Sequence, residues 1–365
     1  MMNAAKCYAW TLLAIGGVGL LLLAAPAGVH AEENDAQAAV PPTLTDLGVA
    51  FEEARLRPHA ERAGALGELA VSLEALLDRG IDSKDKNAAR FLSAEIRFAR
   101  GDYAGAAKDF GKAAKKGPFA DDVAFAAIIA LEAQGRDNDA AKKWIKWEKR
   151  YPDSPLAPEA LLARTWNALR RDSLARAQRI LVDLKTRFPF MEANPRTTLA
   201  EATIAYLQNR PQDALAILGD SDNDVETHYL RALCFEASGN ALKAAARYQE
   251  IAERFPHSVL RDRAMLAKAN IFLRSTAYQS AAEEFDKTVE RATLPDVRKE
   301  AELRSAVCLF LDGRVETATD RLRDITSVHA GTDVAARAQL ILGEVLLSEA
   351  RYEDAILELN RVLTV

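Results

Sequence analysis

One alanine recurs along the chain at nearly constant intervals, and a large apolar side chain follows each copy four residues later. The eight alanines are separated by 34, 37, 37, 30, 37, 37 and 37 residues, and they are Ala106, Ala140, Ala177, Ala214, Ala244, Ala281, Ala318 and Ala355. Their large partners are Phe110, Trp144, Leu181, Leu218, Tyr248, Phe285, Leu322 and Leu359. A period of this size is typical of repeat proteins, in which each unit buries its apolar face against its neighbours. The spacing therefore predicts a solenoid rather than a globular enzyme.

Each repeat contains the signals for two antiparallel helices. In the first repeat, Gly101 lies between two stretches of helical periodicity, where glycine permits a tight turn. Small Ala94 and Ala106 allow the two helices to approach closely, and Phe110 fills the space beside them. Because the same arrangement recurs over about residues 87–365, we predict an all-α fold of about eight helix-turn-helix units.

This pattern resembles the tetratricopeptide repeat (TPR) superfamily, whose motif is carried here by Gly101-Asp102-Tyr103 followed by Ala106 and Phe110. The resemblance implies a right-handed α-solenoid over residues 87–365. Most spacings are 37 residues, whereas the superfamily repeat has about 34. The additional residues fall in aromatic-proline turns such as Phe255-Pro256. In this detail the chain is similar to exported bacterial envelope TPR proteins, such as the TolA-binding division coordinator and BamD.

The first 31 residues have the features of an export signal. Lys6 is followed by a stretch without charge up to Glu32, and Thr11–Leu23 is continuously apolar. This pattern predicts a cleaved signal peptide over residues 1–31 and places the mature protein in the periplasm. An uncleaved inner-membrane anchor is the alternative, because the uncharged stretch is nearly long enough to span a bilayer. Membrane contact is expected only in that case.

Two further segments precede the repeats. Residues 32–45 are polar, small and proline-bearing, which predicts a flexible linker. Residues 46–86 have helical periodicity, with Leu66 and Leu69 on one face and a stop at Gly80. We interpret this segment as an N-terminal helical cap, because an uncapped solenoid exposes one face of its core.

Composition and motifs argue against catalysis and nucleic-acid binding. The net charge is −5 and no basic block stands out, so a nucleic-acid surface is not expected. The five histidines are scattered, and no H-E-x-x-H, C-x-x-C, G-x-S-x-G or phosphate-binding loop occurs after the signal segment. We therefore predict no enzyme activity, no cofactor and no metal site.

Two local features have alternative interpretations. Residues 220–224 begin like a calcium-binding loop, but Val225 and Arg231 occupy positions where that loop requires Gly and Glu. A helix-capping connector is the favoured interpretation. Cys234 and Cys308 occupy the same position two repeats apart, a separation too large for a disulfide. We therefore expect two buried, unpaired thiols.

In TPR proteins the first helices line a ligand-binding groove, so the resemblance assigns each repeat groove-facing positions. With the alanine as position twenty, the fifth position holds Phe91, Phe125, Leu162, Leu199, Tyr229, Leu266, Leu303 and Leu340. The ninth holds Glu95, Ile129, Trp166, Thr203, Leu233, Asn270, Val307 and Glu344. Every fifth position is apolar or aromatic, which excludes the Lys- and Asn-based carboxylate clamp of the chaperone-docking TPR class.

A mainly apolar groove suits a hydrophobic segment or an amphipathic helix. The candidate groove residues are Phe91, Phe125, Trp166, Tyr206 and Tyr229. In the alternative interpretation, these side chains only pack between neighbouring first helices.

The sequence therefore predicts a non-catalytic protein–protein interaction scaffold of the bacterial cell envelope, whose partner is an envelope protein or peptide. A second hypothesis is a structural or assembly subunit that self-associates through an uncapped C-terminal face formed by Ile356, Leu359 and Val362. A third is an accessory subunit of envelope glycan handling or export.

Overall fold

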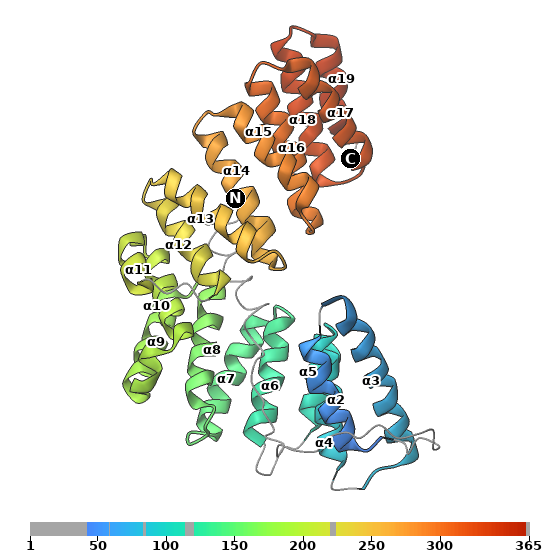
Figure 1. Cartoon of the computed structure of the whole chain (residues 1–365), viewed down its shortest axis with the longest axis vertical. Coiled ribbons are helices and arrows are strands. Elements are labelled where there is room, and N and C mark those ends of the chain that lie inside the picture. Colours follow the sequence, from blue (N-terminus) through green and yellow to red (C-terminus); the bar gives the residue numbers. More distant parts are fainter. Residues whose placement is uncertain (1–41, 58, 83–84, 114–119, 220–223, 363–365) are drawn as a thin grey trace. The chain divides into compact units, whose positions relative to one another are not determined.

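The computed structural model of the chain describes residues 42–57, 59–82, 85–113, 120–219 and 224–362 (Figure 1). The predicted signal peptide, residues 32–41 of the predicted linker and residues 220–223 of the Asp-rich loop lie outside the described residues. All regular elements within the described part are helices, so the predicted all-α class is confirmed.

The chain divides into two compact units, residues 1–200 and 201–365, and the division falls within α10. The helices up to this division are α2 (Leu44–Leu56), α3 (His59–Arg79), α4 (Lys86–Ala99), α5 (Tyr103–Lys112), α6 (Ala120–Ala133), α7 (Asp137–Arg150), α8 (Ala157–Arg170), α9 (Leu174–Arg187), the short 3₁₀ helix η1 (Pro189–Ala193) and α10 (Pro195–Leu207). Those after it are α11 (Pro211–Leu218), α12 (Val225–Ala237), α13 (Ala241–Arg254), α14 (Val259–Arg274), α15 (Tyr278–Arg291), α16 (Pro295–Leu311), α17 (Val315–Val328), α18 (Asp333–Ser348) and α19 (Tyr352–Val362). In each unit, helices consecutive in the chain pack on one another as expected for a solenoid.

The repeating alanines lie where the two helices of each repeat meet. All eight have an exposed fraction of 0%. In the first repeat, Ala94 of α4 shares one apolar cluster with Ala106 and Phe110 of α5. Ala269, Ala281 and Phe285 form the corresponding cluster in α14 and α15. The predicted role of small residues in close helix packing is therefore confirmed.

The turn between the two helices of a repeat has the same backbone conformation in all eight repeats. Its central residue is in the left-handed region with φ between 57° and 85°, and these residues are Gly101, Gly135, Asp172, Asn209, Gly239, Thr276, Gly313 and Ala350. Glycine adopts this region without strain, whereas a β-branched residue such as Thr276 does not. Repeat geometry therefore imposes the turn even where the residue disfavours it.

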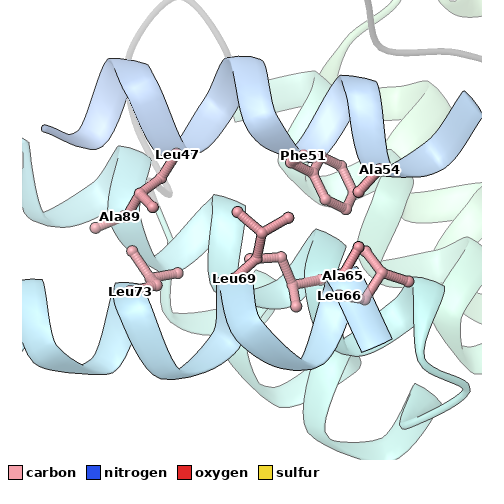
Figure 2. Close-up of a cluster of buried hydrophobic side chains, with 9 residues drawn as sticks. Leu47, Phe51, Ala54, Ala65, Leu66, Leu69, Leu73 and Ala89 are labelled. Atoms are coloured by element: carbon pink, nitrogen blue, oxygen red, sulfur yellow. The ribbon is translucent and has the colours of Figure 1, made fainter. Parts of the chain in front are cut away.

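The helices before the first repeat pack as a hairpin on α4. Thr43 and Asp46 form a capping box that starts α2 at Leu44, inside the segment predicted as linker. In the cluster shown in Figure 2, Leu47 and Phe51 of α2 face the leucines of α3. Ala89 of α4 belongs to the same cluster, so the hairpin covers the apolar face of the first repeat.

In unit 2, the 30-residue spacing between Ala214 and Ala244 has a structural counterpart, and the prediction of two buried, unpaired thiols is confirmed. The second helix of the fourth repeat, α11, has only 8 residues and ends at Leu218, with Gly219 as its C-cap. Cys234 and Cys308 are buried and unpaired. Burial raises the pKa of Cys234 to about 12 and that of Cys308 to about 11, so both remain protonated thiols at neutral pH.

None of the helices among the described residues is both long enough and apolar enough to cross a membrane.

Candidate first-helix binding face

In unit 1, two of the predicted groove residues are half-buried on their first helices. The ring of Phe91 on α4 meets Phe110 edge to face, with 5.5 Å between centroids. Phe125 on α6 meets Trp144 and Trp147 at 4.9 and 6.0 Å. Both phenylalanines therefore contribute to helix packing and also keep part of their rings at the surface.

Trp166 does not lie at the surface. Its exposed fraction is 4%, and nearly every residue of α8 is buried. The prediction that Trp166 faces a partner is therefore wrong in this structure, because α8 is packed on all sides rather than on one. The ninth position of a repeat is exposed only where neighbouring helices leave it uncovered.

In unit 2, Tyr206 on α10 and Tyr229 on α12 are half-buried. Tyr229 packs edge to face on Tyr248 of α13, with 5.6 Å between centroids. Burial, with smaller effects from nearby Cys234 and Glu236, raises the pKa of Tyr206 to about 12. Tyr206 is therefore a neutral aromatic group with a hydroxyl that can donate a hydrogen bond.

Beside these tyrosines, a glutamate is held by two donors from different helices. Tyr248 Oη donates to Glu236 Oε2 at 2.9 Å, and Arg274 Nη2 donates to Glu236 Oε1 at 2.7 Å. The Arg274 side chain is 57% exposed, so its guanidinium retains donors that face solvent.

The same combination occurs in unit 1, but there it is buried. Trp144 Nε1 donates to Glu132 Oε1 at 2.8 Å, and Arg170 Nη2 lies 3.0 Å from Glu132 Oε2. Arg170 is also paired with Asp137 at 2.6 Å, and its side chain is only 2% exposed. Burial raises the pKa of Glu132, against the opposing effects of Arg170 and Trp144. The buried pair of Glu132 and Arg170 therefore links two consecutive repeats within the core of unit 1.

Sequence reasoning missed these glutamate–arginine pairs, although the repeat numbering contained a signal for them. Glu132 and Glu236 both occupy position twelve of their repeats, and Arg170 and Arg274 both occupy position thirteen of the next repeat. A comparison of the fifth and ninth positions alone does not find this pattern.

The first helices of unit 2 also form a polar network that was not predicted. Arg304 of α16 donates to Asn270 of α14 at 2.6 Å and to Glu300 at 2.6 Å. Arg337 of α18 donates to the other oxygen of Glu300 at 2.8 Å. Burial opposes ionisation of Glu300, but these two arginines outweigh it and lower its pKa. The first-helix face of unit 2 is therefore more polar than the predicted apolar groove.

Comparisons with known proteins agree with the repeat geometry. Family models described as tetratricopeptide repeat match residues 57–121, 93–155 and 226–258. The fold is shared by a tetratricopeptide repeat protein from Parabacteroides merdae, at 16% identity and a TM-score of 0.54 over 71% of this chain and 99% of that one. Residues 57–155 and 226–258 therefore carry tetratricopeptide repeats.

Two further solved structures share the fold of this TPR protein. One is the signal transduction ATPase with a tetratricopeptide repeat sensor from Pyrococcus horikoshii, at 14% identity and a TM-score of 0.56, covering 82% of this chain and 52% of that one. The other is the apo form of the quorum sensor NprR from B. thuringiensis, at 12% identity and a TM-score of 0.56, covering 88% and 98%. No curated protein matches the sequence.

The last described repeat of this TPR protein has an uncovered apolar face. Ile356 of α19 is 59% exposed, whereas Thr319 and Ala282, at the same position of the preceding repeats, are 6% and 3% exposed. Leu359 is half-buried because its side chain packs closely on Gly343 of α18, where an added Cβ would lie only 2.6 Å from it. Val362 is half-buried as well, so Ile356 is the most exposed of the three predicted residues.

The described residues contain no group of His, Cys, Asp and Glu side chains placed to hold a metal ion.

Proposed function

We propose that this TPR protein is a non-catalytic scaffold of the bacterial cell envelope that binds an apolar or helical segment of an envelope protein on the first-helix face of unit 2. TPR domains are in general protein–protein interaction scaffolds. The observation that carries the proposal is the juxtaposition of half-buried Tyr206 and Tyr229 with the solvent-facing pair of Glu236 and Arg274.

This arrangement has the properties of a protein-binding site. Tyrosine and arginine are enriched at the residues that contribute most to binding energy in protein interfaces. Tyr229 is already held against Tyr248, so little side-chain entropy is lost when a partner covers it. An amphipathic helix would place its apolar face on the tyrosines and an acidic residue at its edge near Arg274.

The N-terminal sequence supports the proposed location. Lys6, the apolar stretch Thr11–Leu23 and the acidic residues after Ala31 follow the order of a cleaved export signal. The proposal expects the mature protein in the periplasm to begin at Glu32, which mass spectrometry of its N-terminal peptide tests.

The binding face is tested with the double variant Tyr206→Ala/Tyr229→Ala. Crosslinking in cells should capture partners with the wild-type protein and lose at least about nine-tenths of that capture with the variant, because two tyrosine contacts at the centre of an interface carry much of its affinity. Tyr352→Ala is the matched control, since Tyr352 on α19 is 62% exposed and lies outside this face. Unchanged capture by a double variant with wild-type circular dichroism would show that the face does not bind partners.

A second candidate function is self-association through α18 and α19. The observation that favours it is the exposure of Ile356 on α19, at 59% against 6% and 3% for Thr319 and Ala282 at the same position of the preceding repeats. An apolar side chain that is exposed where other repeats bury it is typical of an interaction surface. Light scattering should then detect a dimer that Ile356→Lys abolishes and that Val328→Lys, at an even more exposed position at the end of α17, leaves intact. A wild-type protein that is monomeric at high concentration contradicts this candidate.

A further inference from the structure

Unit 1 contains a surface cleft on the side of its second helices. It lies between α7 and α9, and α8 contributes one residue between them. Its volume is about 470 Å³, and its lining residues are Glu148, Arg164, Arg176, Arg179, Ile180 and Asp183. None of these residues belongs to the predicted groove, so this cleft is a separate surface from the one assigned above.

The two carboxylates of the cleft already have cationic partners. One oxygen of Glu148 bonds to Arg164, and the other accepts from Arg187 Nη1 at 2.9 Å. Arg187 also donates to Asp183 at 3.3 Å. The Arg164 side chain is only 15% exposed, so this part of the cleft is a fixed, neutralised network.

The other two arginines of the cleft are exposed and have donors available. Within the described part of the chain, Arg176 has no ion pair and no side-chain hydrogen bond. Arg179 uses only Nε, which donates to the carbonyl of Ala175 at 3.3 Å, so its two Nη groups remain available. Because the two residues are three apart on α9, their guanidinium groups project from the same face of the helix.

An apolar hollow adjoins the cleft at the carboxyl ends of α7 and α9. Glu148 and Arg164 line both spaces, and the hollow also contains Tyr151, Pro152 and Leu161. The combined groove therefore has free arginines at one end and an aromatic, proline-bearing wall at the other.

We propose that the α7–α9 cleft is a docking surface for an acidic peptide segment of a partner protein. Carboxylates of the segment pair with Arg176 and Arg179, because guanidinium groups match carboxylates through two parallel hydrogen bonds. An apolar side chain of the same segment packs on the exposed surfaces of Tyr151 and Pro152 at the edge of the hollow, which at about 10 Å³ has room for no more than a water molecule. Because Glu148 and Asp183 are already paired with Arg164 and Arg187, only Arg176 and Arg179 are available, and two cations suit the few carboxylates of a peptide better than the closely spaced phosphates of a nucleic acid.

The test measures binding of a fluorescein-labelled peptide that repeats Glu-Glu-Leu, using fluorescence anisotropy at low salt. The wild-type protein should bind this peptide, and Arg176→Ala/Arg179→Ala should weaken binding by about tenfold or more. Binding should also weaken as salt is added, because exposed ion pairs are screened. The matched control is Arg210→Ala/Arg351→Ala, which removes two exposed arginines from unit 2.

Three results overturn the proposal. The first is equal peptide affinity for the wild type and the Arg176/Arg179 variant, and the second is equal affinity for a peptide that repeats Gln-Gln-Leu. The third is tighter binding of a single-stranded DNA of matched charge, which would identify the cleft as a general polyanion site. Arg176 and Arg179 are exposed, so their replacement is not expected to affect folding. The Tyr206/Tyr229 variant should bind the Glu-Glu-Leu peptide normally, which separates this proposal from the proposed function.

Discussion

Asp262 provides the sharpest test of how consecutive repeats are held together. Its side chain, at the start of α14, has an exposed fraction of 0%. One oxygen accepts from Thr293 N at 2.6 Å, Thr293 Oγ1 at 2.9 Å and Leu294 N at 2.8 Å, while the other is paired with Arg261. One carboxylate therefore fastens the turn between α15 and α16 to the first helix of the preceding repeat.

The variant Asp262→Ala should lower the free energy of unfolding by about 3–5 kcal/mol. Two backbone N–H groups lose their acceptor, and each buried unsatisfied donor costs about 1–3 kcal/mol. The charge of Arg261 also loses its partner, and breaking one side of a buried pair costs about 3–5 kcal/mol. These contributions overlap, so their sum is an upper bound. Asp262→Asn retains an oxygen acceptor and should fall between the alanine variant and the wild type.

The measurement is urea denaturation followed by far-ultraviolet circular dichroism, with hydrogen exchange of the Leu294 amide as a local readout. Asp320→Ala is the control, since this aspartate is 77% exposed and its loss should change stability by less than about 0.5 kcal/mol. A loss below about 1 kcal/mol for Asp262→Ala, with an unchanged exchange rate at Leu294, would falsify the proposed role of this carboxylate.

The pH dependence of the same variant has a definite sign. Burial alone would raise the pKa of Asp262, but hydrogen bonds from Leu294, Arg261 and Thr293 outweigh it and hold the pKa below its ordinary value of 3.8. The stabilisation by this carboxylate is therefore fully present above pH 3.8 and is lost as pH falls through the lower folded-state value. The difference between wild type and Asp262→Ala should shrink in that acidic window.

Three other tests, which use four substitutions, address separate parts of the structure. Arg170→Met should destabilise the protein by about 3–5 kcal/mol, because the buried carboxylates of Glu132 and Asp137 lose their cationic partner. Arg274→Met, at the equivalent but exposed position, should cost less than about 1 kcal/mol. Equal losses of unfolding free energy in the two variants would contradict this assignment. Thr276→Gly should stabilise the protein by about 0.5–1 kcal/mol in thermal unfolding, because Thr276 has a φ of 57°, which glycine adopts without strain. A lower melting temperature of the variant would show that this turn is not strained in the wild type. Burial raises the pKa of Glu95 from 4.5 to about 7, so the stability of the wild type should fall as pH rises between these values. Glu95→Gln should therefore be more stable than the wild type by roughly 1–3 kcal/mol at pH 8, but not at pH 4. Urea midpoints that do not change with pH would contradict this prediction.

The candidate binding residues were only partly predictable from the sequence, because the exposure of a side chain depends on all the helices packed around it. The repeat numbering located Phe91, Phe125, Tyr206 and Tyr229 on the first helices, and all four are half-buried there. The repeat numbering predicted the same surface position for Trp166, but close packing around α8 buries this residue. Position in a repeat determines which way a side chain points, but the neighbouring helices determine whether it reaches solvent.

Charged residues show the same limit more strongly. Glu132 and Glu236 occupy equivalent positions and accept equivalent hydrogen bonds, yet one pair lies in the core and the other faces solvent. The arginines of the α7–α9 cleft come from two different helices, and only the folded chain separates the paired members from the free ones.

The sequence alone determined the all-α class, the period of the repeat and the contact between its two helices, because these depend on local helix signals and on small residues recurring at a fixed interval. Ala106 and its seven equivalents were identifiable without coordinates, and each is fully buried. Only the tertiary structure decided which polar groups pair between repeats and which aromatic and basic side chains remain exposed. The physical reason is that hydrogen bonding, burial and pKa depend on groups that are distant in the sequence and are brought together only when the repeats stack.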